Sequence, residues 1–404
     1  MKDALKIALG IVTGIGGFLD AGTIATSAQA GARFQYHLLW VLALGTLCII
    51  FISEMLGRLA AISKHTLADA IRERFGIRYH ALPLVSEIFL DVTVLTAELG
   101  GVAIAVKLLT GIGFAWWALP VGLAVWTLLW RGKFEAMEDG VALLGLMTLV
   151  FAVAAWKLHP DLHAIVQGLR PQLPDQKPAQ YWFIAVSILG SLLSPYVLNF
   201  YSAGAIEEKW TAEDLTANRL SASIGMGFGG AVGAALLVAC GAALFPRGID
   251  ASTYDEMQLA VAFPLGMRLG GTLFAVALGI ACFGAALQVA LNLSYTLAQA
   301  FGWNWSENLK PHEDARFACV YTAAIPAAAL VVLFFDPLNV TMIAMALNAV
   351  IAPLIVFPLL ILMNDTAYLR EHTNGPIGNV LVAVVIVLAC LFGLVAIPLE
   401  VLGG

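Results

Sequence analysis

Residues 14–23 read GIGGFLDAGT, and residues 190–196 read GSLLSPY. Each stretch lies in the middle of a long apolar run, where it places glycine or proline together with polar side chains. The first stretch also places a carboxylate there, that of Asp20. The two stretches occupy corresponding positions of two successive sets of five apolar segments. This arrangement is typical of an inverted repeat whose first and sixth helices unwind at the middle of a membrane.

The composition of the whole chain is that of an all-α polytopic membrane protein. Of its 404 residues, 60% are hydrophobic and 12% are charged, whereas about a quarter of the residues of a soluble domain are charged. The apolar runs reach about 20 residues or more, the length that a helix needs to cross a hydrocarbon core of about 30 Å. Backbone groups in lipid must form hydrogen bonds within their own segment, so these runs are expected to be helices.

We expect a single transmembrane domain over residues 1–404, with about eleven helices. Spans one to five cover about residues 5–157, spans six to ten about 180–363, and span eleven about 376–399. The basic stretch of residues 64–78 is expected to form a short interfacial helix before span three. The expected spans lie near residues 5–31, 37–63, 81–109, 114–130, 136–157, 180–205, 217–245, 268–301, 314–335, 339–363 and 376–399.

The distribution of basic residues predicts the orientation of the chain. Of the 21 Lys and Arg residues, 14 fall on the side of the N-terminus and 7 on the other side. Basic residues are enriched in the cytoplasmic connections of membrane proteins. The N-terminus is therefore predicted to be cytoplasmic and, with eleven spans, the C-terminus outside.

The carboxylate of Asp20 requires an explanation, because it lies at the middle of a span. An unpaired charge at that depth costs several kcal/mol, so acids in membrane helices mark substrate or proton paths. The glycines could serve close helix packing, and Pro195 could merely kink its helix. Packing alone gives no role to Asp20, for which we expect a functional one.

Three stretches of the sequence resemble a known family. GGFLDAGTIATSAQAGARFQYHLLW (residues 16–40), AELGGVAIAVKLLTGI (97–112) and SPYVLNFYSAG (194–204) are similar to the first, third and sixth helices of Nramp (natural resistance-associated macrophage protein) divalent-metal transporters. The order of the remaining spans also fits. The resemblance implies a LeuT-type fold, with a five-plus-five inverted repeat and an added eleventh helix. It also implies uptake of divalent metal, often coupled to protons.

Two motifs depart from the pattern of the family. Where the family has Asp-Pro-Gly-Asn, residues 20–23 read DAGT, so Thr23 replaces an amide ligand by a hydroxyl. Where the family has Met-Pro-His, residues 194–196 read SPY, so Ser194 replaces a soft thioether by a hard oxygen. Hard oxygen ligands and a roomier site suit Mg²⁺, which keeps part of its water shell. The pattern is similar to a divergent Nramp-related branch of Mg²⁺ transporters, and we expect Mg²⁺ with Mn²⁺ tolerated.

The resemblance also implies a set of ligands for the metal. Asp20 would be the charged ligand, the carbonyls of Gly17 and Ser191 would assist, and the hydroxyls of Thr23 and Ser194 would contact the ion directly or through water. Further membrane amides could line the path or could simply form interhelical hydrogen bonds. These amides are Gln288 and Asn292 in span eight and Asn348 in span ten.

Several groups on which the family relies for proton movement are missing. The third-helix glutamate is matched by Glu98, but the aspartate three residues earlier is Leu95. The sixth-helix histidine is Tyr196, which does not titrate near neutral pH. Arg316 matches one of two ninth-helix arginines. We therefore expect weak or absent proton coupling, with Tyr196, Glu98, Gln288, Asn348 and Arg316 as candidate pathway or relay residues.

An acidic stripe on span three has two interpretations. Glu87 and Asp91 lie one helical turn apart, and Glu98 returns to roughly the same face. The stripe could be a proton wire. It could also be structural, with Glu87 and Asp91 wetted near the end of the span.

Other functions remain as alternatives to a Mg²⁺ carrier. A proton-coupled Mn²⁺/Fe²⁺ transporter of the ordinary Nramp type is one, and an organic-solute carrier on the same fold is another. A non-transporting scaffold or sensor is a third, although such a protein would not need a charge at mid-membrane. No nucleotide-binding loop, nucleophile elbow or kinase motif occurs, so neither ATP-driven transport nor enzymatic activity is expected.

The expected partners follow from the interpretation of the chain as a membrane transporter of divalent metal. They are the divalent metal ion, as substrate, and the lipid bilayer of a bacterial plasma membrane. We expect no cofactor, no nucleic acid and no obligatory protein partner.

Overall fold

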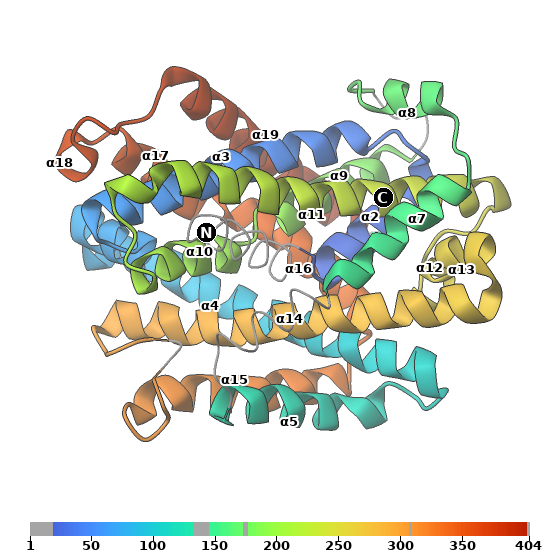
Figure 1. Cartoon of the computed structure of the whole chain (residues 1–404), viewed down its shortest axis with the longest axis horizontal. Coiled ribbons are helices and arrows are strands. Elements are labelled where there is room, and N and C mark those ends of the chain that lie inside the picture. The colour runs from blue at the N-terminus through green and yellow to red at the C-terminus, as the bar shows by residue number, and fades with distance from the viewer. Residues whose placement is uncertain (1–18, 132–144, 173–176, 307–308, 402–404) are drawn as a thin grey trace.

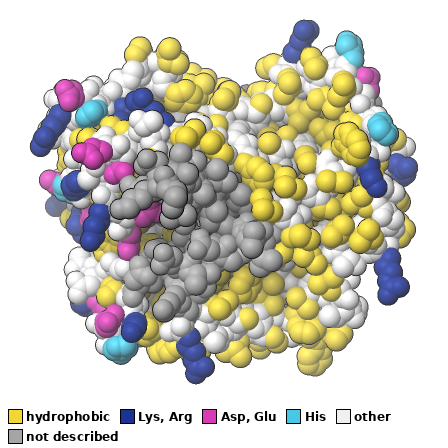
Figure 2. All heavy atoms as spheres, viewed as in Figure 1, with side chains coloured by type: hydrophobic (Ala, Val, Ile, Leu, Met, Phe, Trp, Pro, Cys, Tyr) yellow, Lys and Arg dark blue, Asp and Glu magenta, His cyan; other side chains and the backbone are white. Residues whose placement is uncertain are grey.

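The computed structural model describes residues 19–131, 145–172, 177–306 and 309–401, and their secondary structure is helical, with no β-strand in these ranges. Figure 2 shows that the charged and histidine side chains of one face gather toward its left and right ends, with hydrophobic side chains between them. This distribution fits helices that cross a membrane and expose only their ends to water. The expectation of an all-α membrane protein is confirmed.

Eight helical segments in the described residues are long and apolar enough to cross a membrane, or nine if a bent pair counts as one span. Three shorter helices lie in the other expected spans, so each of the eleven expected spans contains a described helix. The segments are α3 (Leu39–Ser63), α4 (Leu67–Thr110), α9 (Pro178–Leu192) with α10 (Pro195–Glu207), α11 (Leu215–Ala243), α14 (Met267–Phe301), α15 (Ala315–Val332), α16 (Pro337–Ile351) with α17 (Pro353–Met363), and α19 (Pro376–Val401). The shorter helices are α2 (Ala21–Phe34), α5 (Ala115–Arg131) and α7 (Val150–Lys157).

The sixth span is broken where the sequence predicts it. The last residue of α9 is Leu192, and α10 begins at Pro195. Between them, Leu193 (φ −112°) and Ser194 (ψ 129°) leave the helical conformation. Pro195 has no backbone N–H group and is favoured in the first turn of a helix, where no intrahelical hydrogen bond is lost, which fits a new helix that begins at this residue.

The first span is also interrupted at the predicted depth. Asp20 is extended (φ −127°, ψ 177°), and α2 begins directly after it. Gly17 lies outside the described residues. The tenth span has a discontinuity that we did not predict, because α16 ends at Ile351 and α17 begins at Pro353.

The expected interfacial helix before span three is separated from that span by one glycine. Within α4, Gly76 has φ 81° and ψ 165°, a conformation open almost only to glycine. Leu67 to Phe75 therefore forms a separate helical piece, and the membrane-spanning part follows the break. The helix continues without another such break to Thr110.

The two interrupted spans lie side by side and are held together by α16. In the packing of the bundle α2 contacts α9, α11 and α16, and α9 contacts α16 and α19. A Cβ at Gly22 of α2 would lie 2.3 Å from Met345 Sδ of α16, and a Cβ at Gly190 of α9 would lie 1.7 Å from the Met345 carbonyl oxygen. Gly190 therefore allows the close approach of α9 and α16, because a backbone atom blocks any side chain there, whereas a side chain at Gly22 would require Met345 to move.

The remaining helices surround this centre. α4 packs along α14, and α5 packs against α15 at the lower edge of the view in Figure 1. The connection of residues 246–267 carries α12 (Tyr254–Met257) and α13 (Leu259–Leu265). Tyr254 and Met257 are buried there, so this connection packs against the bundle.

Candidate functional site

Asp20 lies at the N-terminus of α2, where its carboxylate caps the helix. The backbone N–H of Thr23 donates to Asp20 Oδ1 at 2.6 Å. The first N–H groups of a helix have no intrahelical acceptor, and they carry a partial positive charge that stabilises an anion. The local sequence therefore places a negative charge at the interruption of the first span.

The sixth span contributes a second contact to the same carboxylate. The hydroxyl of Tyr196, in the first turn of α10, donates to Asp20 Oδ2 at 3.2 Å. Thr23 is buried, and its methyl group faces α11, where a Cβ at Gly233 would lie 3.3 Å from it. The structure thus brings Asp20 and Thr23 of the first interrupted stretch together with Tyr196 of the second.

Glu98 of α4 reaches the same helix end. Its two carboxylate oxygens accept from the backbone N–H of Ala21, at 3.2 and 3.1 Å. Glu98 is fully buried (0% exposed). Two carboxylates, those of Asp20 and Glu98, therefore meet at the N-terminus of α2. Among the described residues, neither forms an ion pair with Lys, Arg or His.

The break between α9 and α10 is lined by hydroxyl and amide groups. Ser194 Oγ donates to the carbonyls of Gly190 (3.0 Å) and Ser191 (3.3 Å), and it accepts from Asn348 Nδ2 of α16 at 2.8 Å. The hydroxyl groups of Ser191 and Thr26 of α2 lie 3.5 Å apart. The Oδ1 atom of Asn348 is buried and has no hydrogen-bond partner among the described atoms. We call Asp20, Thr23, Tyr196, Ser194 and Asn348 the central site.

Met345 is a residue of this region that the sequence reasoning missed. It lies one turn before Asn348 on α16, and Asn348 Nδ2 is 3.8 Å from its sulfur. The same sulfur lies against Gly22. The sequence signal was the three-residue spacing, which puts Met345 and Asn348 on one helical face. A thioether therefore lies near the interruption of the first span, although the sixth span supplies none.

Glu87 and Asp91 of the acidic stripe belong to a second buried polar group. Both are buried, so the interpretation that water wets them near the end of the span is wrong. Their partners come from α10 and α14 and include Asn292, the amide that we singled out in span eight. Gln288, one turn earlier on α14, is also buried. We call Glu87, Asp91, Asn199, Asn292 and Thr296 the second polar cluster.

The structure does not bring Arg316 to either group. Arg316 lies in the first turn of α15, and its side chain is 57% exposed. Its guanidinium contacts the carboxylate of Asp314 at 3.1 Å and lies over the ring of Trp303. The hydrogen bond from Arg316 holds the pKa of Asp314 below its ordinary value.

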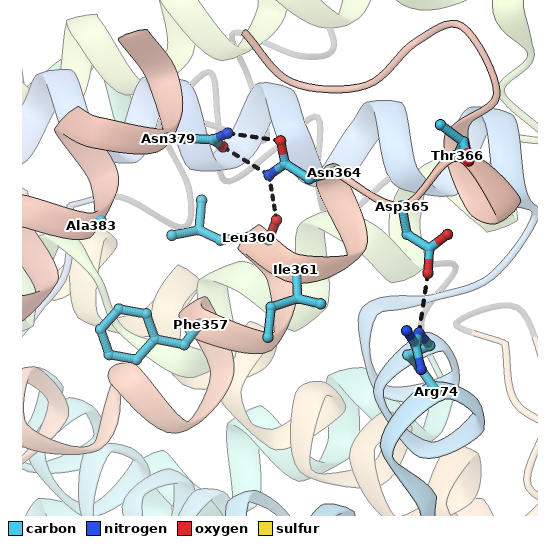
Figure 3. Close-up of a pocket in the computed structure, with 9 residues that line it drawn as sticks. All are labelled: Arg74, Phe357, Leu360, Ile361, Asn364, Asp365, Thr366, Asn379 and Ala383. Carbon is cyan, nitrogen blue, oxygen red and sulfur yellow. Dashed lines mark hydrogen bonds and ion pairs between the residues drawn. The ribbon is translucent and has the colours of Figure 1, made fainter. Parts of the chain in front are cut away.

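The central site is closed in this conformation. Asp20 is 1% exposed, and Ser194 and Asn348 are fully buried. A cavity of about 830 Å³ lies elsewhere, beside α17 and α19 (Figure 3). Its acid, Asp365, is already paired with Arg74 at 3.1 Å, so this cavity offers no free carboxylate to a cation.

Sequence comparisons identify relatives of the chain. Residues 10–397 match the family described as natural resistance-associated macrophage protein-like (Nramp). The chain is 28% identical to the divalent metal cation transporter MntH of Aeromonas hydrophila over 390 residues, which are 92% of this chain and 91% of that protein. It is 29% identical to MntH of Deinococcus radiodurans over 278 residues, which cover 65% of this chain and 61% of that protein.

Structural comparisons confirm the expected LeuT-type fold. The chain is similar to the manganese transporter of Eremococcus coleocola crystallised with an aromatic bis-isothiourea substituted compound (TM-score 0.80, 21% identity), over 97% of this chain and 86% of that one. It is also similar to MhsT in complex with L-phenylalanine (TM-score 0.62, 16% identity), over 96% of this chain and 97% of that one. At these identities the likeness is one of fold alone.

Proposed function

The chain belongs to the Nramp family, and on that premise we propose that it is a secondary transporter that takes up divalent metal cations through the central site. The observation that carries this proposal is the carboxylate of Asp20, buried between two interrupted helices without a basic partner among the described residues. A buried charge needs compensation, and a cation supplies it. The names of the MntH relatives support the same class of substrate.

We propose that the ligands of the metal are Asp20, Thr23, Ser194 and the carbonyls of Gly17 and Ser191. The break between α9 and α10 supports this set, because broken helices turn carbonyl groups toward a substrate. The free Oδ1 atom of Asn348 adds an oxygen next to Ser194. Asp20 would be the only carboxylate among these ligands, since Glu98 is bound to the backbone N–H of Ala21. One carboxylate ligand gives modest affinity, which suits a carrier that must release its cargo.

The preferred ion in this proposal is Mg²⁺, with Mn²⁺ tolerated. Thr23 and Ser194 present hydroxyl oxygens, and hard oxygens favour Mg²⁺ over softer metals. Met345 supports a second candidate, a Mn²⁺ transporter, because its sulfur lies beside Gly22 and Asn348. Thioether ligands favour softer ions. The two candidates differ in whether this sulfur reaches the ion.

We propose that proton coupling is weak or absent and that voltage drives uptake. Leu95 and Tyr196 replace titrating groups of the family, and Glu98 is engaged with the N-terminus of α2. Arg316 lies at an exposed helix end. A dication gains about 4.6 kcal/mol per 100 mV of inside-negative potential, at about 2.3 kcal/mol per charge. The proposed location is the plasma membrane of a bacterium, with the N-terminus in the cytoplasm and the C-terminus outside.

An organic-solute carrier is the alternative from another substrate class. The likeness to MhsT shows that the fold occurs in a protein bound to L-phenylalanine. Two carboxylates at the N-terminus of α2 argue against it, because Asp20 and Glu98 would repel the carboxylate of an amino acid. The helix end that could bind such a group is already occupied by these side chains.

Flux into proteoliposomes tests the proposal. The full chain would be reconstituted with an internal Mg²⁺-sensitive dye, and separate vesicles would be given a panel of radiolabelled amino acids. We expect Mg²⁺ and Mn²⁺ influx in the wild type and no amino-acid uptake. Asp20→Asn should abolish influx, since asparagine retains the helix cap but not the charge.

The matched control is Asp161→Asn. Asp161 also caps a helix, α8 (Leu162–Gly168), but it is exposed and lies in a connection. Its substitution should leave influx unchanged. Full metal influx with Asp20→Asn, or amino-acid uptake without metal influx, would overturn the proposed function.

A further inference from the structure

The second polar cluster has no role in the proposed function, yet it is as deeply buried as the central site. Glu87 and Asp91 lie one turn apart on α4 and are 3% and 1% exposed. Asn292 and Thr296 of α14 are buried against them. Asn199 of α10 completes the group. Three membrane helices thus converge on two carboxylates.

Neutral donors converge on these carboxylates. Asn292 Nδ2 donates to Glu87 Oε1 at 3.1 Å and to Asp91 Oδ2 at 2.8 Å. The hydroxyl of Thr296 (3.1 Å) and the amide of Asn199 also donate to Glu87 Oε1. Among the described residues no Lys, Arg or His forms an ion pair with either acid. Amide and hydroxyl donors do not cancel the charge of two buried carboxylates.

One oxygen in the cluster lacks a partner. Asn292 is fully buried, and its Oδ1 atom has no hydrogen bond, although its Nδ2 atom serves both carboxylates. A half-turn of this amide exchanges the two atoms and points Oδ1 at the space between Glu87 and Asp91. Glu87, Asp91, Asn292 and Thr296 then present carboxylate, amide and hydroxyl oxygens to this space, while the Nδ2 atom of Asn199 stays on Glu87. Oxygen ligands that carry two negative charges suit a hard divalent cation.

The cluster is connected to the central site along one face of α10. Tyr196, Asn199 and Ser202 follow each other at three-residue spacing. Their side chains contact Asp20, Glu87 and the backbone N–H of Leu67, respectively.

The hydrogen bond between Ser202 and Leu67 shows toward which end of the bundle this face of α10 extends. Leu67 is the first residue of α4, and its neighbour Thr66 hydrogen-bonds to Gln299 near the end of α14. The face therefore runs from the central site, past the cluster, to the end of the bundle where α4 begins. On α4, Asp91 lies seven residues from Glu98, a rise of about 10 Å.

We propose that the second polar cluster binds a divalent cation, as a station between Asp20 and the side of the membrane on which α4 begins. The role of the cluster as an intermediate binding site during transport rests on the proposed function. The binding of an ion there does not depend on Asp20. An ion that leaves Asp20 toward this side would reach the carboxylates of Glu87 and Asp91, beside Asn199 of α10, without crossing an apolar stretch.

The test is the number of Mn²⁺ ions bound per chain, measured by equilibrium dialysis and electron paramagnetic resonance on the purified full chain in nanodiscs. We expect two ions for the wild type and one for Asp20→Asn. The double variant Glu87→Gln/Asp91→Asn should also bind one ion, and the triple variant with Asp20→Asn should bind none. Glu213→Gln, at an exposed acid, is the control and should bind two.

The outcomes separate this inference from the proposed function. Asp20→Asn that binds no Mn²⁺ overturns the inference, because carboxylates holding only protons would give that result. One ion retained by the triple variant also overturns it, since the ion then lies elsewhere. If the proposed function alone fails, the wild type and Asp20→Asn bind the same single ion, and the ion is lost with Glu87→Gln/Asp91→Asn.

A gain-of-binding variant guards against loss of the ion through misfolding. Asn292→Asp replaces the amide by a third carboxylate of the same shape. In the Asp20→Asn background it should tighten Mn²⁺ binding about tenfold and increase the Mn²⁺-dependent rise of the melting temperature. Unchanged or weaker binding would contradict a cation site, because a purely structural cluster gains nothing from added charge.

Discussion

At the scale of single residues, the proposed metal selectivity depends on where oxygen and sulfur atoms lie around Asp20. Its two carboxylate oxygens accept from Thr23 and Tyr196, one on each interrupted span. Ser194 supplies an oxygen at the position where the family motif Met-Pro-His has the methionine sulfur. Met345 places a sulfur on a third helix, α16. Selectivity among divalent metals should therefore respond to substitutions at these last two positions.

Ser194→Met should raise the ratio of Cd²⁺ to Mg²⁺ influx about tenfold, equivalent to about 1.4 kcal/mol of differential binding. A thioether at this position would contact the ion directly, and Cd²⁺ is the softer metal. The measurement is competitive influx into proteoliposomes. An unchanged ratio would show that residue 194 does not contact the ion.

Met345→Leu separates the Mg²⁺ and Mn²⁺ candidates. Leucine has a similar volume but no sulfur, so packing against Gly22 is largely kept. If Met345 is not a ligand, as the Mg²⁺ proposal holds, the ratio of Mn²⁺ to Mg²⁺ influx should stay within about twofold of the wild type. A fall of about tenfold in this ratio would favour the Mn²⁺ candidate.

At the scale of elements, the interrupted helices were predictable because glycine and proline leave a trace in the sequence. Asp20 lies directly before the first residue of α2, Pro195 is the first residue of α10, and Gly76 lies at the break in α4. The partners were not predictable from spacing. Tyr196 is 176 residues from Asp20, and Glu98 is 77 residues from Ala21. Such pairs are set by how the spans pack, which only the resemblance to the family indicated.

The acidic stripe shows the same limit within one helix. The spacing of Glu87 and Asp91 correctly put them on one face, but it could not show whether that face meets water or protein. The face meets Asn292 and Asn199 of two other helices. Met345 was missed for a related reason. In an apolar span, the sequence does not distinguish a methionine near a site from one that only packs in the hydrophobic core.

Gly190→Ala should disrupt the packing of α9 on α16. The added Cβ would lie 1.7 Å from the carbonyl oxygen of Met345, a backbone atom that has little room to move. Overpacking of this kind costs about 1–3 kcal/mol, and a backbone clash belongs at the upper end. The measurement is thermal unfolding in detergent, where we expect a clear loss of stability.

The matched control for this substitution is Gly204→Ala on α10. A Cβ at Gly204 would meet no atom within 4 Å. Alanine is the better helix former by up to about 1 kcal/mol, so this variant should be unchanged or slightly more stable. Equal melting temperatures for the two variants would contradict the described packing of α9 and α16.

At the scale of the whole molecule, the conformation is closed around the central site. Burial of Asp20 on all sides suits an intermediate of a carrier, which must never open its site to both faces of the membrane at once. On the face drawn in Figure 2 the charged side chains gather toward its two ends, with hydrophobic side chains between them. A dication that crosses this region carries two charges on which the membrane potential acts.

Uptake should follow the membrane potential and ignore the pH gradient. With two charges moved, each 30 mV or so of inside-negative potential should raise the equilibrium accumulation of Mg²⁺ about tenfold. Proteoliposomes with a potassium diffusion potential and pH clamped on both sides would show this. Proton influx that accompanies Mg²⁺, reported by an internal pH dye, would contradict uncoupled transport.

In the proposed function, the carboxylate of Asp20 at the interruption of the first span receives the metal. The most direct measurement is anomalous diffraction from crystals of the protein grown with Mn²⁺. We expect an anomalous peak in contact with Asp20 and with oxygens of the break between α9 and α10, and no such peak in crystals of Asp20→Asn. A wild-type crystal with Mn²⁺ bound elsewhere and none at Asp20 would contradict it.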